Sequence, residues 1–195
     1  MTVSWEELLA SIGSCERCRL SASRKNTVPG EGDPRARLMF IGEGPGANED
    51  EQGRPFVGAA GDLLTRMIEA IGLKREDCYI ANIVKCRPPR NRVPESDEAA
   101  ACLPYLRAQV ALVRPLIIVL LGATALKHTL GGDYRITRDR GRFVERAGVF
   151  MMPTFHPAAL LRDESKKRPA WEDFKAVRDR LYLLKQSQQS DLPTP

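Results

Sequence analysis

The clearest strand in this chain is Leu116-Ile117-Ile118-Val119-Leu120-Leu121-Gly122, which carries no polar side chain. A strand that is apolar on both faces is typical of a parallel sheet covered by helices on both sides. Two more buried strands are predicted over residues 36–42 and 78–84. These three segments predict the core of an α/β protein.

The segments around these strands complete the architecture. The order strand, helix, strand, helix, strand indicates a three-layer α/β/α sandwich around a short, mostly parallel central sheet. Ser4 and Ser96 are the predicted N-caps of two helices, and Pro104 is expected to kink the second. We expect one domain over residues 1–185 and a disordered tail over 186–195. The predicted helices span residues 4–12, 60–72, 96–113, 123–130 and 171–185, and further strands span 142–145 and 149–154.

Composition bounds the class of protein. A chain of 195 residues fits one domain, and no apolar run approaches the ~18 residues of a membrane helix. Residues 1–7 show neither a basic start nor an apolar stretch, so we expect no secretory signal and a cytoplasmic location. We also expect a monomer. The net charge is +5, which solubility alone could explain. However, the basic residues gather over 17–25, 85–92, 135–146 and 162–168, as on a surface that follows phosphates.

The five cysteines are unevenly spaced. Cys15 and Cys18 form a C-x2-C pair, whereas Cys86 and Cys102 lie far downstream, and Cys78 opens an apolar strand as a small buried side chain. Disulfides are not expected in a reducing compartment. Structural zinc usually has two tight ligand pairs, whereas iron–sulfur clusters accept one tight pair plus distant thiolates. Spacing alone leaves a cluster, a zinc ion and no metal as alternatives.

Three polar motifs follow predicted strands. The first strand runs into Gly42-Glu43-Gly44-Pro45-Gly46, the second carries Asn82 near its end, and the last ends in Thr154-Phe155-His156-Pro157. Sites on parallel sheets lie beyond the carboxyl ends of the strands. We therefore expect the three motifs to converge on one pocket.

The loop over residues 43–58 differs from the usual phosphate-binding loops. It has neither a G-x-G-x-x-G that leads into a helix nor a Gly-Lys-Ser/Thr. Its carboxylates, Glu49, Asp50 and Glu51, would repel phosphate and suit a neutral base or a developing sugar cation better. Ordinary structural roles remain open for the single residues: a solvated acidic turn, a core position for Phe56, a strand-end amide for Asn82 and a structural histidine for His156.

These motifs, taken in order, resemble the family 4 uracil-DNA glycosylases, the iron–sulfur type of bacteria and archaea. The resemblance runs from Cys15 to about Arg162. It rests on the spacing of four cysteines and on three segments, Gly53-Arg54-Pro55-Phe56-Val57-Gly58, Asn82-Ile83-Val84-Lys85-Cys86-Arg87-Pro88-Pro89 and Phe155-His156-Pro157-Ala158-Ala159-Leu160-Leu161-Arg162.

The resemblance implies an enzyme of base-excision repair. It implies that uracil is flipped out of single- or double-stranded DNA and that its N-glycosidic bond is hydrolysed, with a [4Fe–4S] cluster held by Cys15, Cys18, Cys86 and Cys102. Asn82 would read the base edge, Phe56 would stack on the ring beside Gly44, and His156 would stabilise the leaving uracil anion. An Asp of the wider superfamily that orients water has no counterpart at Gly44, so Glu43 or, with slight preference, Glu49 would assist. The residues expected to contact DNA are Arg87, Arg90, Arg92, Leu160, Leu161 and Arg162.

Two other functions compete with this one. A nucleobase deaminase would need H-x-E with P-C-x-x-C, and the chain has neither motif. A non-catalytic iron–sulfur or zinc-stapled DNA-binding protein could keep the cysteines and the basic loops without placing Asn82 and His156 in one pocket. The positions of these two side chains therefore distinguish the alternatives.

Overall fold

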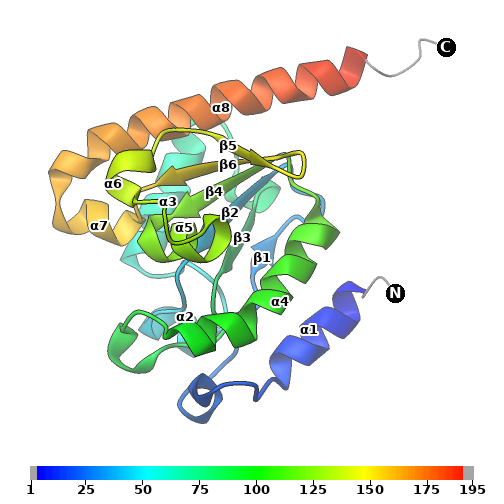
Figure 1. The fold of residues 1–195 in the computed structure, drawn as a ribbon, viewed down its shortest axis with the longest axis vertical. Coiled ribbons are helices and arrows are strands. Elements are labelled where there is room, and N and C mark those ends of the chain that lie inside the picture. The colour runs from blue at the N-terminus through cyan, green and yellow to red at the C-terminus, as the bar shows by residue number, and fades with distance from the viewer. Residues whose placement is uncertain (1–3, 191–195) are drawn as a thin grey trace.

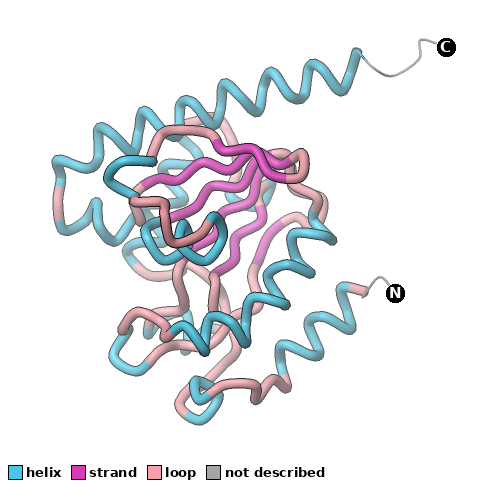
Figure 2. Tube along the Cα trace, viewed as in Figure 1, coloured by secondary structure: helices cyan, strands magenta, loops and turns pink. Residues whose placement is uncertain are grey.

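A six-stranded mixed sheet forms the centre of the computed structural model, which describes residues 4–190, with side chains through Ser187 (Figure 2). The strand order is β1-β3-β2-β4-β6-β5. The four central strands pair in parallel, and the edge strands β1 and β5 are antiparallel. The predicted fold class is confirmed. The strands are β1 Glu31–Gly32, β2 Leu38–Gly42, β3 Tyr79–Asn82, β4 Ile117–Leu121, β5 Val144–Arg146 and β6 Val149–Thr154.

Helices cover both faces of the sheet, and each strand alternates its side chains between them. In β2, Met39 and Ile41 face a core shared with α1, α4 and α5, whereas Leu38 and Phe40 face a core shared with α3 and α8. Helices α1 and α4 lie side by side on the first face (Figure 1). The long helices are α1 Trp5–Gly13, α3 Ala59–Ala70, α4 Ser96–Val113, α5 Gly122–Leu130 and α8 Lys167–Ser190.

The short elements lie in the connections between strands and long helices. One of them, α2, occupies a segment that the sequence analysis treated as loop. The short helices are α2 Ala47–Gln52, α6 Ile136–Asp139 and α7 Pro157–Arg162, and the 3₁₀ turns are η1 Arg19–Ala22, η2 Arg75–Asp77, η3 Pro89–Asn91 and η4 Glu164–Lys166.

Several predicted helix limits need correction. Ser4 caps α1 as expected, but the N-cap of α4 is Glu95, whose backbone N–H donates to the Glu98 carboxylate at 2.8 Å, so the prediction for Ser96 is wrong. Helix α4 continues through Pro104 as one element. The last helix runs to Ser190, so residues 186–190 are not the predicted disordered tail, because glutamine-rich sequence without Pro or Gly sustains a helix. Residues 191–195 of that tail lie outside the described residues.

The sheet places its functional edge at the carboxyl ends of β2, β3, β4 and β6, which run in the same direction. Between residues 4 and 190 no helix has the length and apolar character needed to span a membrane. The connections that leave these four strand ends carry the polar motifs.

Candidate active site and metal centre

A cleft of about 760 Å³ opens at the carboxyl edge of the parallel strands. The predicted convergence of the three motifs is confirmed, because the loop after β2, the end of β3 and the segment after β6 all line this cleft. The connection after β4 also lines it, which the sequence analysis did not anticipate. Its walls include Glu43, Gly44, Phe56, Asn82, Thr124 and His156.

Asn82 is the last residue of β3 and is 2% exposed. Its Oδ1 atom is buried and has no hydrogen-bond partner among the described residues. Close packing holds the side chain in place, since a Cβ atom on Gly42 would lie 2.4 Å from Asn82 Oδ1 and 2.6 Å from Phe56 Cζ. Leaving a buried acceptor without a hydrogen-bond donor costs about 1–3 kcal/mol of stability. The unpaired oxygen therefore indicates a ligand that donates a hydrogen bond to it.

Phe56 and His156 form a stacked pair in the cleft. Their ring centroids are 5.5 Å apart and the ring planes are inclined by 28°. Phe56 has a φ of 52°, a conformation that bulky residues rarely adopt and that occurs most often where function requires it. The pair provides a flat apolar wall beside the Asn82 amide, which suits a planar heterocycle.

The tautomer of His156 follows from its hydrogen bond. The backbone N–H of Ala158 donates to His156 Nδ1 at 3.1 Å, so His156 is the N-cap of α7 and the ring proton resides on Nε2. Burial, followed by the nearby positive charge of Arg162, lowers the pKa of His156 to about 4. His156 is therefore a neutral donor at physiological pH.

The two candidate carboxylates are held differently. Glu49 accepts three backbone hydrogen bonds, from Gly46 at 3.0 Å, from Val57 at 2.9 Å and from Gly58 at 3.0 Å, and so closes the loop that carries Phe56. Glu43 accepts one hydrogen bond, from the Thr124 hydroxyl. A carboxylate has about four acceptor positions. Glu43 therefore keeps more free acceptor capacity at the cleft than Glu49.

The predicted DNA contacts in α7 differ in exposure. Leu160 is 1% exposed because α7 turns this side chain toward the protein interior, so the prediction that Leu160 faces DNA is wrong. Leu161 is 47% exposed, and Arg162 lines the cleft. Only the latter two of the three can meet DNA without a rearrangement of the helix.

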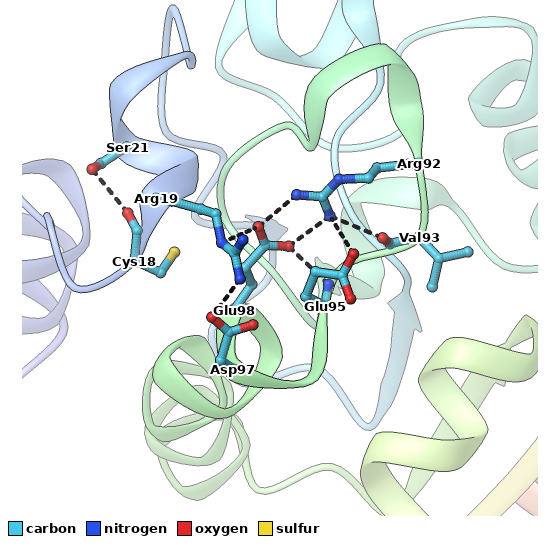
Figure 3. A network of polar contacts seen from close by, with 8 residues as sticks. All are labelled: Cys18, Arg19, Ser21, Arg92, Val93, Glu95, Asp97 and Glu98. Atoms are coloured by element: carbon cyan, nitrogen blue, oxygen red, sulfur yellow. Dashed lines mark hydrogen bonds and ion pairs between the residues drawn. The ribbon is translucent and has the colours of Figure 1, made fainter.

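Among the predicted basic contacts, Arg92 is engaged within the protein (Figure 3). Its guanidinium donates to both carboxylate oxygens of the fully buried Glu98, at 2.7 and 2.8 Å, and lowers the pKa of that carboxyl. Arg19 approaches the same carboxylate at 3.4 Å. Arg87 donates to Asn91 at 2.8 Å. Arg90 is exposed on η3 and is the basic side chain of this loop best placed to test a phosphate contact.

Four of the five cysteines surround one cavity. Cys15 and Cys18, from the segment after α1, line it together with Cys86 and Cys102, and all are free thiols. Two of these sulfurs already accept hydrogen bonds from N–H groups. Arg24 Nη1 donates to Cys86 Sγ at 3.3 Å, and the backbone N–H of Lys85 donates to Cys102 Sγ at 3.2 Å. Cys78 lies apart in the other core, as predicted.

This set of donors fits a metal centre bound through thiolates. Burial raises the pKa of Cys102 to about 11 and raises that of Cys86, so a cationic centre is needed to hold them as thiolates at neutral pH. N–H groups directed at the sulfurs are the usual second layer around iron–sulfur clusters. Within the described range, no three His, Cys, Asp or Glu side chains are grouped closely enough for a single ion.

Sequence reasoning missed several residues at the site. Thr124 could have been found by applying the strand-end rule to β4 as well. Thr154, at the end of β6, is fully buried and donates to Asp173 Oδ2 at 2.6 Å, and Arg140 pairs with the same carboxylate. This network fixes the backbone just before His156. Nothing in the local sequence joins Thr154 to residues of α8.

Comparison with known proteins agrees with this geometry. Residues 29–175 match the uracil DNA glycosylase superfamily. The chain is 46% identical over 185 residues to a type-4 uracil-DNA glycosylase of Sulfurisphaera tokodaii, covering 90% of this chain and 84% of that protein. It is 47% identical over 168 residues to the type-4 enzyme of Thermotoga maritima, covering 83% and 88% of the two chains. A type-5 uracil-DNA glycosylase of Pyrobaculum aerophilum is 30% identical over 189 residues, covering 80% and 83%. With this similarity and this cleft, the chain belongs to the type-4 family of uracil-DNA glycosylases.

Proposed function

We propose that this protein removes uracil from DNA by hydrolysing the bond between the base and deoxyribose, in base-excision repair. The observation that carries the proposal is the buried, unpaired Oδ1 of Asn82, which lies beside the stacked Phe56–His156 pair. The cleft thus combines a hydrogen-bonding edge with an aromatic wall. Because a base within a duplex cannot reach such a cleft, the nucleotide must be flipped out, at a cost of a few kcal/mol.

Asn82 reads the edge of the flipped base. Its amide oxygen accepts from uracil N3–H, and its amide nitrogen donates to uracil O4. Cytosine presents the opposite pattern, with an acceptor at N3 and a donor at N4, and would leave both partners unpaired. Such mismatches can support discrimination of about 10⁴-fold or more.

His156 stabilises the leaving group. As the glycosidic bond breaks, the bonding electrons move onto uracil and negative charge develops on O2. The neutral imidazole donates its Nε2 proton in a hydrogen bond to this oxygen. Donors that are already in place where charge develops provide large rate effects because they need no reorganisation.

Glu43 orients the water that attacks the cation-like sugar. Water adds to C1′ and loses a proton to the carboxylate, which leaves an abasic site. The uracil anion takes up a proton from solvent, and Glu43 returns its proton to solvent. We assign this role to Glu43 rather than Glu49 because Glu49 is occupied by three backbone donors. Gly44 and Arg162 line the base-binding cleft. Arg162 contacts the flanking phosphate, and the exposed side chain of Leu161, the preceding residue of α7, replaces the flipped base.

We further propose that Cys15, Cys18, Cys86 and Cys102 hold a [4Fe–4S] cluster. When bound, such a cluster cross-links distant segments and provides a one-electron redox centre. Here the four cysteines would tie the segment after α1 to Cys86 in the connection between β3 and α4 and to Cys102 within α4. Free cysteines and a DNA substrate agree with a cytoplasmic, nucleoid-associated enzyme, and we propose that it acts as a monomer.

The direct test is a single-stranded oligonucleotide with one uracil, incubated with the protein and then treated with alkali. We expect cleavage at the uracil position and none in the matched thymine oligonucleotide. Binding to both oligonucleotides without cleavage of either would instead indicate the non-catalytic DNA-binding alternative.

The metal centre gives a prediction that does not depend on activity. Protein purified without oxygen should be brown and contain about four irons per chain. Cys102→Ser should lose the colour, whereas Cys78→Ser, the control cysteine in the other core, should keep it. Iron and zinc analysis decides the matter, and one zinc with full activity in a colourless protein would contradict the cluster.

Salt dependence tests the basic loop. Arg90→Ala should reduce the slope of log K against log salt concentration by about 0.7–0.9, the contribution of one phosphate contact, without changing base preference. Arg92 is unsuitable for this test, since its loss would leave Glu98 buried and unpaired. Lys185→Ala on α8 is the charge-matched control. An unchanged slope for Arg90→Ala would show that the loop does not contact DNA.

The lowered pKa of His156 predicts the pH dependence. Because the proton leaves the imidazole near pH 4 rather than near 6.5, the neutral donor is present throughout the range above about pH 5. The single-turnover rate constant should therefore show no inflection near pH 6.5 and should fall only as the pH approaches 4. Measurement with saturating enzyme separates chemistry from binding, and a loss of rate as pH rises through 6.5 would indicate a cationic histidine instead.

A further inference from the structure

Lys85 is a lysine enclosed in the protein interior. It is 1% exposed, and it lies in the short segment between Asn82 and Cys86. Its Nζ donates to the backbone carbonyl of Asn82 at 2.9 Å and to Gln109 Oε1 at 2.6 Å. Lysine is rarely fully buried unless it is paired, so this position calls for an explanation that the proposed chemistry does not supply.

The same residue also contacts the metal-binding segment. The backbone N–H of Lys85 donates to Cys102 Sγ at 3.2 Å, and the next residue along the chain is Cys86. Gln109 lies two helical turns after Cys102 on α4. The sulfur that accepts from the Lys85 backbone and the amide that accepts from the Lys85 ammonium group therefore lie on one face of one helix. Gln109 is itself fixed, since its Nε2 donates to the Pro29 carbonyl at 2.7 Å and to the Tyr79 hydroxyl at 3.1 Å.

We infer that Lys85 is a positioning residue that fixes the position of the uracil-reading amide of Asn82 relative to helix α4 and its metal ligand Cys102. This inference rests on the proposed function. The ammonium group fixes the peptide that follows Asn82, and that peptide sets the direction of the Asn82 side chain. Helix α4, which carries both Cys102 and Gln109, is the rigid support. Lys85 touches neither the base nor the sugar, so its effect on the reaction passes through Asn82.

A double-mutant cycle tests this arrangement. Lys85→Met keeps an unbranched side chain but removes the donor. In the wild-type background it should lower the single-turnover rate on uracil by about 10- to 100-fold, the range expected for one hydrogen bond made by a charged group. In the Asn82→Ala background the same change should alter the rate by less than about twofold, because effects that pass through one residue are not additive.

A purely structural role would give a different pattern. If Lys85→Met lowers the rate equally in both backgrounds, Lys85 acts on the fold and not on Asn82, and the inference is overturned. Iron per chain should stay at the wild-type value in Lys85→Met, and binding of uracil-containing DNA should fall less than the rate. Leu181→Ala, a buried change on α8, serves as the control, since it should lower the melting temperature without slowing cleavage.

Two further outcomes have different meanings: a Lys85 variant that does not fold, and a wild-type protein that does not cleave uracil-containing DNA. If Lys85→Met does not fold with iron, Lys85→Gln takes its place, because it retains a hydrogen-bond donor. Lys85→Gln should lower the single-turnover rate less than Lys85→Met, and again only when Asn82 is present. Equal rate losses with and without Asn82 would overturn the inference. If the wild-type protein leaves uracil-containing DNA intact, the proposed function fails, whereas wild-type cleavage with additive variants refutes only the role of Lys85.

Discussion

Replacing His156 with alanine is expected to slow single-turnover release of uracil by about 10²- to 10³-fold, the usual loss when one donor to a developing anion is removed. Binding of uracil-containing DNA should change little, because the hydrogen bond to O2 strengthens mainly as the bond breaks. The structure shows which ring nitrogen acts. Nδ1 already accepts a hydrogen bond from the Ala158 backbone, so only Nε2 remains to donate to the substrate.

Two controls separate chemistry from structure in this experiment. His156 also caps α7, and loss of a cap costs about 1 kcal/mol. His156→Asn keeps a capping side chain but shortens the reach of the donor, and it should be nearly as slow as the alanine variant. His128→Ala removes the other histidine, on α5, and should retain the wild-type rate. Equal losses of binding and rate in His156→Ala would mean that His156 only anchors the helix that ends at Arg162.

Asn82→Asp is expected to change which base is removed. An ionised carboxylate accepts hydrogen bonds but cannot donate to uracil O4, whereas it can accept from the N4 amine of cytosine. Uracil cleavage should fall by about 10²- to 10⁴-fold, as for a site built to bond a group that is then left unpaired. The residual activity should shift toward cytosine.

The measurement compares single-turnover cleavage of matched oligonucleotides that carry uracil or cytosine at one position. It is best made near pH 8, where the introduced carboxyl is most fully ionised. Asn48→Asp is the matched control, since it adds the same charge to another amide of the same cleft. A parallel loss on both bases in Asn82→Asp, or the same shift in Asn48→Asp, would show that Asn82 does not read the edge.

The strands other than the two-residue edge strand β1, and the place of the site, could be predicted from the sequence. Segments such as 116–122 are apolar on both faces, and only a parallel sheet between two helical layers buries both. Once that is fixed, the carboxyl ends of the strands must share one edge, so Glu43, Asn82 and His156 were expected to meet. Hydrophobic pattern is a local property, and strand direction follows from chain connectivity.

What each side chain does at that edge required the tertiary structure. The sequence offered both Glu43 and Glu49, with a slight preference for Glu49. In the structure three backbone N–H groups occupy Glu49, while Thr124, from a distant strand end, donates to Glu43. Leu160 and Leu161 are neighbours, and only the packing of α7 buries one and exposes the other.

The basic side chains show the same division. Arg90 and Arg92 resemble two phosphate contacts in the sequence, but the fold brings the buried Glu98 beneath Arg92. Lys85 looks like another exposed basic residue of that segment, whereas the fold encloses it between Asn82 and Gln109. The sequence alone determined the layers, the shared direction of the four central strands and the edge where the site forms, because these depend on hydrophobic period and chain order. Only the tertiary structure decided the partner of each charged or polar group, because those partners come from elements far apart in the chain.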